Sequence, residues 1–266
     1  MKKKTRVILT TVIGLLLLMA VAAAGLNAVF TVTLVSTQFS LITEAGSEDA
    51  AALKEKLDGY VGKNTTFLSL KKLENDVAEY PCFRLDSVKK KYPSTVEVKI
   101  SERRERFALC EEDIYFIVDE DGYCMDMRAQ NTNRAGGDNI LLEGFSLQAS
   151  VGSPLSGEHL EELLAIFEVF DAHLGDPRAN ISSVTCKVSA SPEPGRFSSV
   201  FSVQMREGVR IEIDEPEEHP AQKAYAALFD EAGGYFTLDE RGKSGGSISV
   251  VSVGEEIIVN YNFSRG

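Results

Sequence analysis

The pattern of apolar and polar positions separates one long apolar run from a series of shorter amphipathic segments. Residues Val7 to Phe30 carry no charged side chain, whereas four cations lie among residues 1–6. A helix of about 20 apolar residues spans the hydrocarbon core of a membrane, and flanking cations favour the cytoplasmic side. The pattern predicts a cytoplasmic tail at 1–6, a single transmembrane helix at 7–30 and an extracytoplasmic remainder.

A cleaved signal peptide is the alternative interpretation of this run. Ala22-Ala23-Ala24 offers a small-residue cleavage site behind a basic N-terminus. The apolar run is longer than the usual signal-peptide core of about 7–15 residues, and it continues through the alanines into Val29 and Phe30. We therefore favour an uncleaved anchor, and either interpretation exports the residues from 31 onward.

Residues 31–106 show the pattern of a small β-α-α-β-β domain. Helical spacing of apolar residues predicts one helix over 47–62, capped by Ser47. A second helix is expected to begin at Ser69 and to end before Pro81, because proline disfavours the helical conformation in the residue that precedes it.

Three strands complete this small domain. The clearest is Thr95 to Glu102, where apolar and polar residues alternate. A strand from Phe83 to Tyr92 precedes it, with a change of phase near Asp86 that predicts a β-bulge. An earlier strand is expected within Phe30 to Thr43. Two helices on one face of such a sheet can bury a hydrophobic core.

Residues 107–266 predict a larger mixed α/β domain dominated by an antiparallel sheet. Asp121-Gly122 marks a hairpin turn. Two amphipathic helices are expected, the second over Ala221 to Glu231, and two alternating strands follow at Ser247–Val253 and Glu256–Phe263. The predicted fold class of the whole chain is therefore α+β, behind a single transmembrane helix.

The charge distribution agrees with this division. The net charge of −12 is uneven, because residues 107–266 carry −17, from 11 Lys/Arg and 28 Asp/Glu, whereas residues 47–106 are near neutral. A charge step of this kind is typical of a domain boundary. The acidic part should be repelled by nucleic acid and by anionic lipid, so we expect no nucleic-acid partner.

The sequence shows no catalytic constellation, cofactor fingerprint or metal-ligand spacing. The four cysteines form no C-x-x-C pair, which argues against zinc, and Ile117 stands where a calcium loop needs its first ligand. Cys110 and Cys124 flank one predicted strand, so a disulfide between them is possible; buried free thiols are the alternative that we favour. We expect no cofactor, no metal and no small-molecule substrate.

Several short segments carry a family resemblance. They are Gly62 to Leu70, Tyr80-Pro81, Lys91 to Val98 and Glu102-Arg103, in that order and at characteristic spacings. These segments resemble the POTRA domain of the FtsQ/DivIB family of bacterial cell-division proteins. In that family a β-α-α-β-β module directly follows a single N-terminal anchor. The resemblance thus implies a POTRA domain at 31–106.

The distal part resembles the β domain of the same family. The resemblance lies in the Asp-Gly hairpin near Gly122, the strand Val209–Ile213, Lys223 in the helix that follows, and the run Tyr235 to Arg241. It implies a non-enzymatic scaffold at the division septum. Its distal domain would bind FtsL-type and FtsB/DivIC-type single-pass proteins and help to regulate septal peptidoglycan synthesis.

The expected mode of binding is strand addition, in which an open sheet edge near the C-terminus offers unpaired N–H and C=O groups to a partner. The partner-binding residues that we predict are Phe236, Leu238, Arg241, Ile248, Val250, Ile257, Val259 and Tyr261. Two other functions remain open. One is an anchored peptide-binding or sensor module without a role in division, and the other is an exported cell-wall enzyme.

Overall fold

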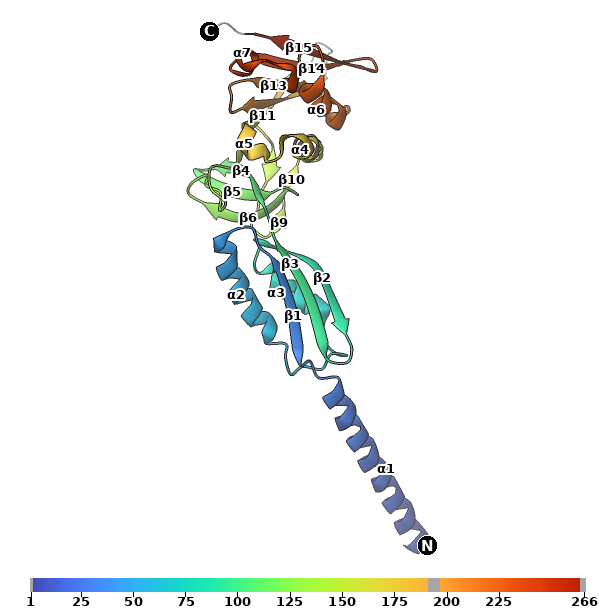
Figure 1. Ribbon diagram of the computed structural model, residues 1–266. Coiled ribbons are helices and arrows are strands. Elements are labelled where there is room, and N and C mark those ends of the chain that lie inside the picture. The colour runs from blue at the N-terminus through green and yellow to red at the C-terminus, as the bar shows by residue number, and fades with distance from the viewer. Residues whose placement is uncertain (1, 191–196, 264–266) are drawn as a thin grey trace. The chain divides into compact units, whose positions relative to one another are not determined.

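The computed structural model describes residues 2–190 and 197–263 (Figure 1). Its contacts divide the chain into two compact units, Met1–Glu102 and Arg103–Gly266. The predicted fold class is confirmed: an apolar N-terminal helix and a β-α-α-β-β segment precede a larger unit built on a mostly antiparallel sheet. The boundary between the units falls four residues before the predicted one at 106/107.

The chain begins with helix α1 (Lys2–Val29). Within the described residues, Thr11–Val29 is the one helical segment long and apolar enough to cross a membrane, and none of it is buried in the fold. Apolar side chains that no part of the described protein covers need another apolar environment. The helix therefore fits a single-pass membrane protein.

The rest of the first unit is a three-stranded sheet with two helices. Strand β3 lies in the centre, parallel to β1 and antiparallel to β2. Helix α2 packs on β1 and helix α3 on β2. The apolar positions that alternate along β3 are fully buried, as their spacing predicts. The elements are β1 (Leu34–Ser40), α2 (Glu44–Asp58), α3 (Leu70–Ala78), β2 (Phe83–Lys91) and β3 (Thr95–Glu102).

Two local predictions in this unit are confirmed and one is wrong. The Ser69 hydroxyl accepts the Lys72 N–H and caps α3, and the β2–β3 register shifts between Leu85 and Ser87, which is the expected bulge. Helix α2, however, begins three residues before the predicted cap at Ser47. Its N-cap is Thr43, whose hydroxyl accepts the Gly46 N–H at 3.0 Å.

The second unit is built on a ten-stranded sheet in the order β15-β14-β13-β12-β11-β7-β4-β5-β6-β9. Neighbouring strands are antiparallel except at three parallel pairs, β4–β7, β7–β11 and β13–β14. The strands are β4 (Glu105–Glu111), β5 (Ile114–Asp119), β6 (Tyr123–Arg128), β7 (Ile140–Glu143), β9 (Ser153–Pro154), β11 (Ile181–Ala190), β12 (Phe197–Met205), β13 (Arg210–Asp214), β14 (Ser247–Val253) and β15 (Glu256–Asn262). Strands β8 (Leu147–Gln148) and β10 (Ser156–Gly157) form a separate pair.

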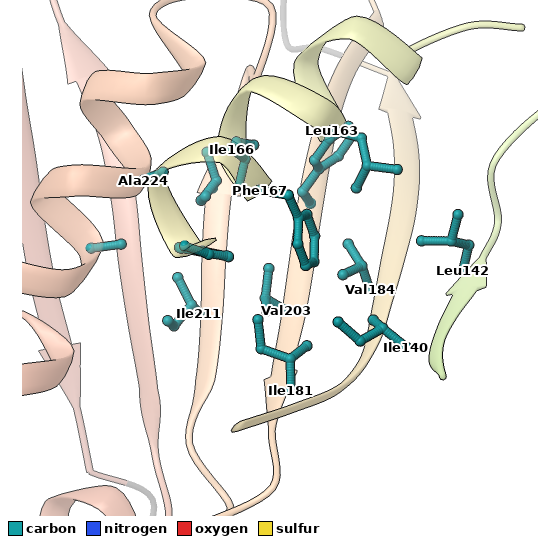
Figure 2. Close-up of a cluster of buried hydrophobic side chains, with 14 of the residues drawn as sticks. Ile140, Leu142, Leu163, Ile166, Phe167, Ile181, Val184, Val203, Ile211 and Ala224 are labelled. Carbon is teal, nitrogen blue, oxygen red and sulfur yellow. The ribbon is translucent and has the colours of Figure 1, made fainter. Parts of the chain in front are cut away.

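The helices of this unit complete its hydrophobic core. Phe167 on α4 points into a cluster of aliphatic side chains from β7, β11, β12 and β13, with Ala224 of α6 beside it (Figure 2). This cluster covers one face of the sheet from β7 to β14 and fixes the positions of the last strands. The helices are α4 (Leu160–Leu174), α5 (Pro177–Asn180), α6 (Pro220–Phe229), the 3₁₀ helix η1 (Tyr235–Thr237) and α7 (Glu240–Lys243).

The four cysteines carry thiols rather than disulfides. Cys110 is opposite Tyr115 in the β4–β5 ladder and Cys124 is opposite Val118 in the β5–β6 ladder, so the two do not face each other. The expectation of buried thiols is met by Cys82, Cys124 and Cys186 and is wrong for Cys110, which is exposed. Burial raises the pKa of both Cys124 and Cys186 to about 11.

Candidate partner-binding edge of the large sheet

Strand β15 ends the large sheet on one side. Among the described strands it pairs only with β14, over seven consecutive residue pairs from Ser247↔Asn262 to Val253↔Glu256. The two-residue turn at Gly254 and Glu255 closes the hairpin between them. The outer side of β15 therefore presents a row of backbone N–H and C=O groups that no described strand satisfies.

The register shows which residues of β15 present these groups. The Arg210 N–H donates to the Gly246 carbonyl at 3.1 Å, so even-numbered residues of β14 bond towards β13. The odd-numbered residues of β14, such as Ser249, must then bond towards β15, where Ser249 is opposite Asn260. Backbone groups alternate in direction along a strand. The even-numbered residues of β15 thus bond to β14. The backbone groups that face outward belong to the odd-numbered residues Ile257, Val259 and Tyr261.

The side chains of these three residues point towards the core, so they are not available for contact with a partner. They share the core face with β14, since Val259 is opposite Val250 and Tyr261 is opposite Ile248. Val259 is buried, and Ile257 and Tyr261 are partly buried against the core. At these predicted positions the backbone, rather than the side chain, is available to a partner.

Ile248 and Val250, which we predicted to lie at the sheet edge, lie on the inner strand β14. Strand β14 is not an edge strand, because it pairs in parallel with β13 and antiparallel with β15. Both side chains are fully buried in the core. The expectation that they belong to an open edge is therefore wrong. They support the edge by holding β15 in place.

Leu238 and Arg241 come close to the C-terminal end of β15. The Tyr261 hydroxyl lies 3.0 Å from the Gly242 carbonyl oxygen and 3.1 Å from that of Gly245, which ties the strand to α7 and the loop after it. Leu238 packs partly on the core, and Arg241 is exposed on α7. Burial, with Asp239 as a smaller cause, raises the pKa of Tyr261.

Phe236 belongs to a different surface, an exposed aromatic row that sequence reasoning missed. Its ring lies 5.2 Å from Phe229, which in turn lies 4.8 Å from Tyr225 and from His173. The Lys243 ammonium lies 4.8 Å from the centre of the Tyr235 ring. Phe236 and Tyr225 keep about half of their surface exposed, at 43% and 53%. The i, i+4 spacing of Tyr225 and Phe229 is the sequence signal of this row.

Lys223, which the sequence pointed to only by family resemblance, is a buried structural residue. Its side chain is fully buried, and its ammonium donates to the carbonyls of Asp214 and Glu215 at 2.7 and 2.8 Å. Burial lowers its pKa despite the surrounding carboxylates. The contact fixes the connection from β13 to α6, and α6 is the crossover that brings β14 alongside β13.

The fold and this edge define a class of protein. Its chain combines one helix long and apolar enough to cross a membrane, a small β-α-α-β-β unit, and a large sheet whose last described strand pairs on one side only. Within the described residues no group of three or more His, Cys, Asp or Glu side chains is placed to hold a metal ion.

Comparison with known proteins gives one informative similarity. No family model matches the chain. The chain is 28% identical, over 111 residues, to the cell division protein DivIB of Clostridium acetobutylicum. The match covers 41% of this chain and 43% of that protein, so it spans less than half of the curated relative. This distant similarity suggests a role in cell division.

Proposed function

We propose that this chain is a DivIB/FtsQ-type protein, a membrane-anchored and non-enzymatic scaffold of the bacterial division machinery. The β-α-α-β-β unit is its POTRA domain, and the large sheet binds FtsL-type and FtsB/DivIC-type single-pass partners at the septum. Through them the scaffold helps to regulate septal peptidoglycan synthesis. The similarity to DivIB and the apolar helix α1 support this assignment.

The observation that carries the proposal is the outer side of β15, which pairs with no other strand among the described residues. A partner segment in extended conformation adds to this edge as an eleventh strand, and main-chain hydrogen bonds supply the affinity. The free donors and acceptors of Ile257, Val259 and Tyr261 take up these bonds. Arg241, which is exposed on α7, adds a charge contact at the end of the added strand.

Proline at position 257 tests this mode of binding. Ile257→Pro removes one outward N–H and leaves the β14 ladder intact, because proline is tolerated on an edge strand whose N–H faces outward. Pull-down of the tagged full chain from membranes, followed by mass spectrometry, should show about a tenfold or larger loss of the single-pass partner. Circular dichroism of the purified variant should show an unchanged fold.

Ile257→Ala is the matched control, since it removes the same partly buried side chain and keeps the N–H. It should retain the partner. Survival of the complex with Ile257→Pro would refute the edge assignment, and so would an equal loss with Ile257→Ala. Ile258→Pro should instead destabilise the unit, because the Ile258 N–H bonds to β14.

A further inference from the structure

The loop between α2 and α3 is tied to the last turn of α1. The Thr65 N–H donates to the Phe30 carbonyl at 2.6 Å, and the Val32 N–H donates to the Lys63 carbonyl at 2.7 Å. The Asn64 side-chain amide donates to the Asn27 side-chain oxygen at 2.6 Å. These bonds hold residues 60–69 directly at the end of the apolar helix.

The β2–β3 turn is tied to the same point. The Thr33 N–H donates to the Ser94 carbonyl at 2.8 Å. The Tyr92 ring meets the Phe30 ring edge-on, with their centres 6.0 Å apart. Two chain segments that are far apart in sequence thus meet where α1 ends.

A membrane around α1 fixes the depth of these segments. The headgroup layer on each side of the hydrocarbon core is about 5–8 Å thick. Phe30 directly follows α1, so groups that hydrogen-bond to Phe30 and Asn27 lie within that layer when α1 spans the bilayer. The tether leaves them no room to withdraw far into water.

The residues at this end have the chemistry of a membrane interface. Phe67 is 85% exposed and Tyr92 is 59% exposed. Segments 60–69 and 89–96 together carry four lysines, Lys63 and Lys89 to Lys91, of which Lys91 is paired with the neighbouring Glu97. Aromatic rings prefer the headgroup level, and each lysine near an anionic surface contributes about 1 kcal/mol.

The opposite end of the same unit carries a group of carboxylates. Glu44, Glu48 and Asp49 lie in the first turns of α2, next to the Glu102 carboxylate at the end of β3. The Ile42 and Thr43 N–H groups both donate to this carboxylate. The exposed aromatic rings and the run Lys89 to Lys91 thus lie at the end that carries the anchor, whereas the far end combines these carboxylates with Arg84.

We propose that this end of the first unit docks on the anionic headgroup surface of the bilayer that α1 crosses. Phe67 and Tyr92 enter the interface, and Lys63 and Lys89 to Lys91 contact lipid phosphates. The inference rests on the proposed anchoring by α1. Docking restricts the movement of residues 31–102 about the end of α1.

The absence of tryptophan from the chain gives a direct test. The full-length Phe67→Trp variant, in liposomes of phosphatidylglycerol and brominated phosphatidylcholine, should lose at least half of its emission relative to the same liposomes without bromine. The emission should also shift to the blue. Leu41→Trp is the control: it is likewise exposed but follows the far end of β1, about 20 Å along the strand. It should keep its emission.

Each other outcome is decisive. Equal quenching at positions 67 and 41, or none at position 67, overturns the docking. Quenching at 67 that is unchanged in liposomes without phosphatidylglycerol overturns the role of the lysines. Release of the chain from liposomes by alkaline carbonate refutes the anchoring itself. A retained chain with unquenched Trp fluorescence at 67 refutes the docking alone.

Discussion

At the scale of single residues, Lys223 shows how a buried charge can serve the fold. Its ammonium bonds to two carbonyls in the turn between β13 and α6. That turn also contains two residues with left-handed backbone, Glu215 and His219, which are costly for residues other than glycine. The lysine stabilises this connection because it donates to the partly buried Asp214 carbonyl and shares the Glu215 carbonyl with the Glu218 N–H.

We expect Lys223→Met to destabilise the second unit by about 2–4 kcal/mol, because the Asp214 carbonyl loses the lysine donor and the Glu215 carbonyl keeps only the Glu218 N–H. Chemical denaturation of the purified protein measures this loss. Lys187→Met, at an exposed position on β11, is the control and should change the free energy of unfolding by less than about 0.5 kcal/mol. A similar effect of both substitutions would contradict the structural role.

The pH dependence of this effect has a defined sign. Burial lowers the pKa of Lys223 below 10.5 in the folded state, so the unfolded state binds more protons in the window below 10.5. The wild-type contribution to stability therefore rises with pH through that window. Lys223→Met lacks this rise. The stability difference between wild type and variant should grow as the pH approaches 10.5, and a constant difference would be inconsistent with the lowered pKa.

At the scale of elements, two glycines with nearly the same φ distinguish the cost of backbone strain from the cost of a steric clash. Gly144 has φ +70° and Gly254 has φ +67°. A Cβ at 144 would lie 2.3 Å from the Cys186 carbonyl oxygen, because the chain leaving β7 passes directly against β11. A Cβ at 254 would meet no described atom within 4 Å.

Gly144→Ala should therefore cost about 2–5 kcal/mol, the sum of backbone strain and overpacking. Gly254→Ala should cost only about 1 kcal/mol, from the backbone alone. Thermal unfolding of the two variants measures the contrast. Equal shifts in Tm would mean that β11 yields to the added methyl group.

Local patterns predicted the elements well where they depend on local chemistry. The alternation along β3, the bulge near Asp86 and the cap at Ser69 could all be found in the sequence. The start of α2 could not, because its cap Thr43 is held by the carboxylate of Glu102, nearly 60 residues further along the chain. Such a contact has no local sequence signal.

The candidate edge was only partly predictable for a related reason. Alternation at Ile248 and Val250 correctly indicated one buried face, but it carries no information about strand neighbours. The parallel pairing of β14 with β13 follows from the crossover through α6, and this pairing makes β15 the last strand. The aromatic row of His173, Tyr225, Phe229 and Phe236 also escaped prediction, because it joins α4, α6 and η1.

At the scale of the whole molecule, the charge distribution suits a chain with two tasks. Residues 47–106 are near neutral and have a basic end at the anchor, whereas residues 107–266 carry −17. Like charges repel, so an anionic membrane surface disfavours adsorption of the distal unit. This repulsion agrees with the proposed binding of other proteins by that unit.

If the chain is a division scaffold, its depletion should make cells grow as filaments, because septation stops while elongation continues. Microscopy after depletion measures this. Expression of the wild type or of Ile257→Ala should restore division, and Ile257→Pro should fail to do so. Normal septation after complete loss would instead favour an anchored peptide-binding module without a role in division.

The outward backbone groups of β15 belong to residues whose side chains are committed to the interior. Most amino-acid changes at those positions leave the main-chain amide in place, so sequence divergence rarely removes these outward N–H and C=O groups. If partners bind by the proposed strand addition, relatives can diverge widely in side chains and still accept the same kind of extended segment. Discrimination between partner segments then has to come from exposed residues beside β15, where substitutions cost little stability. These positions should differ most between lineages.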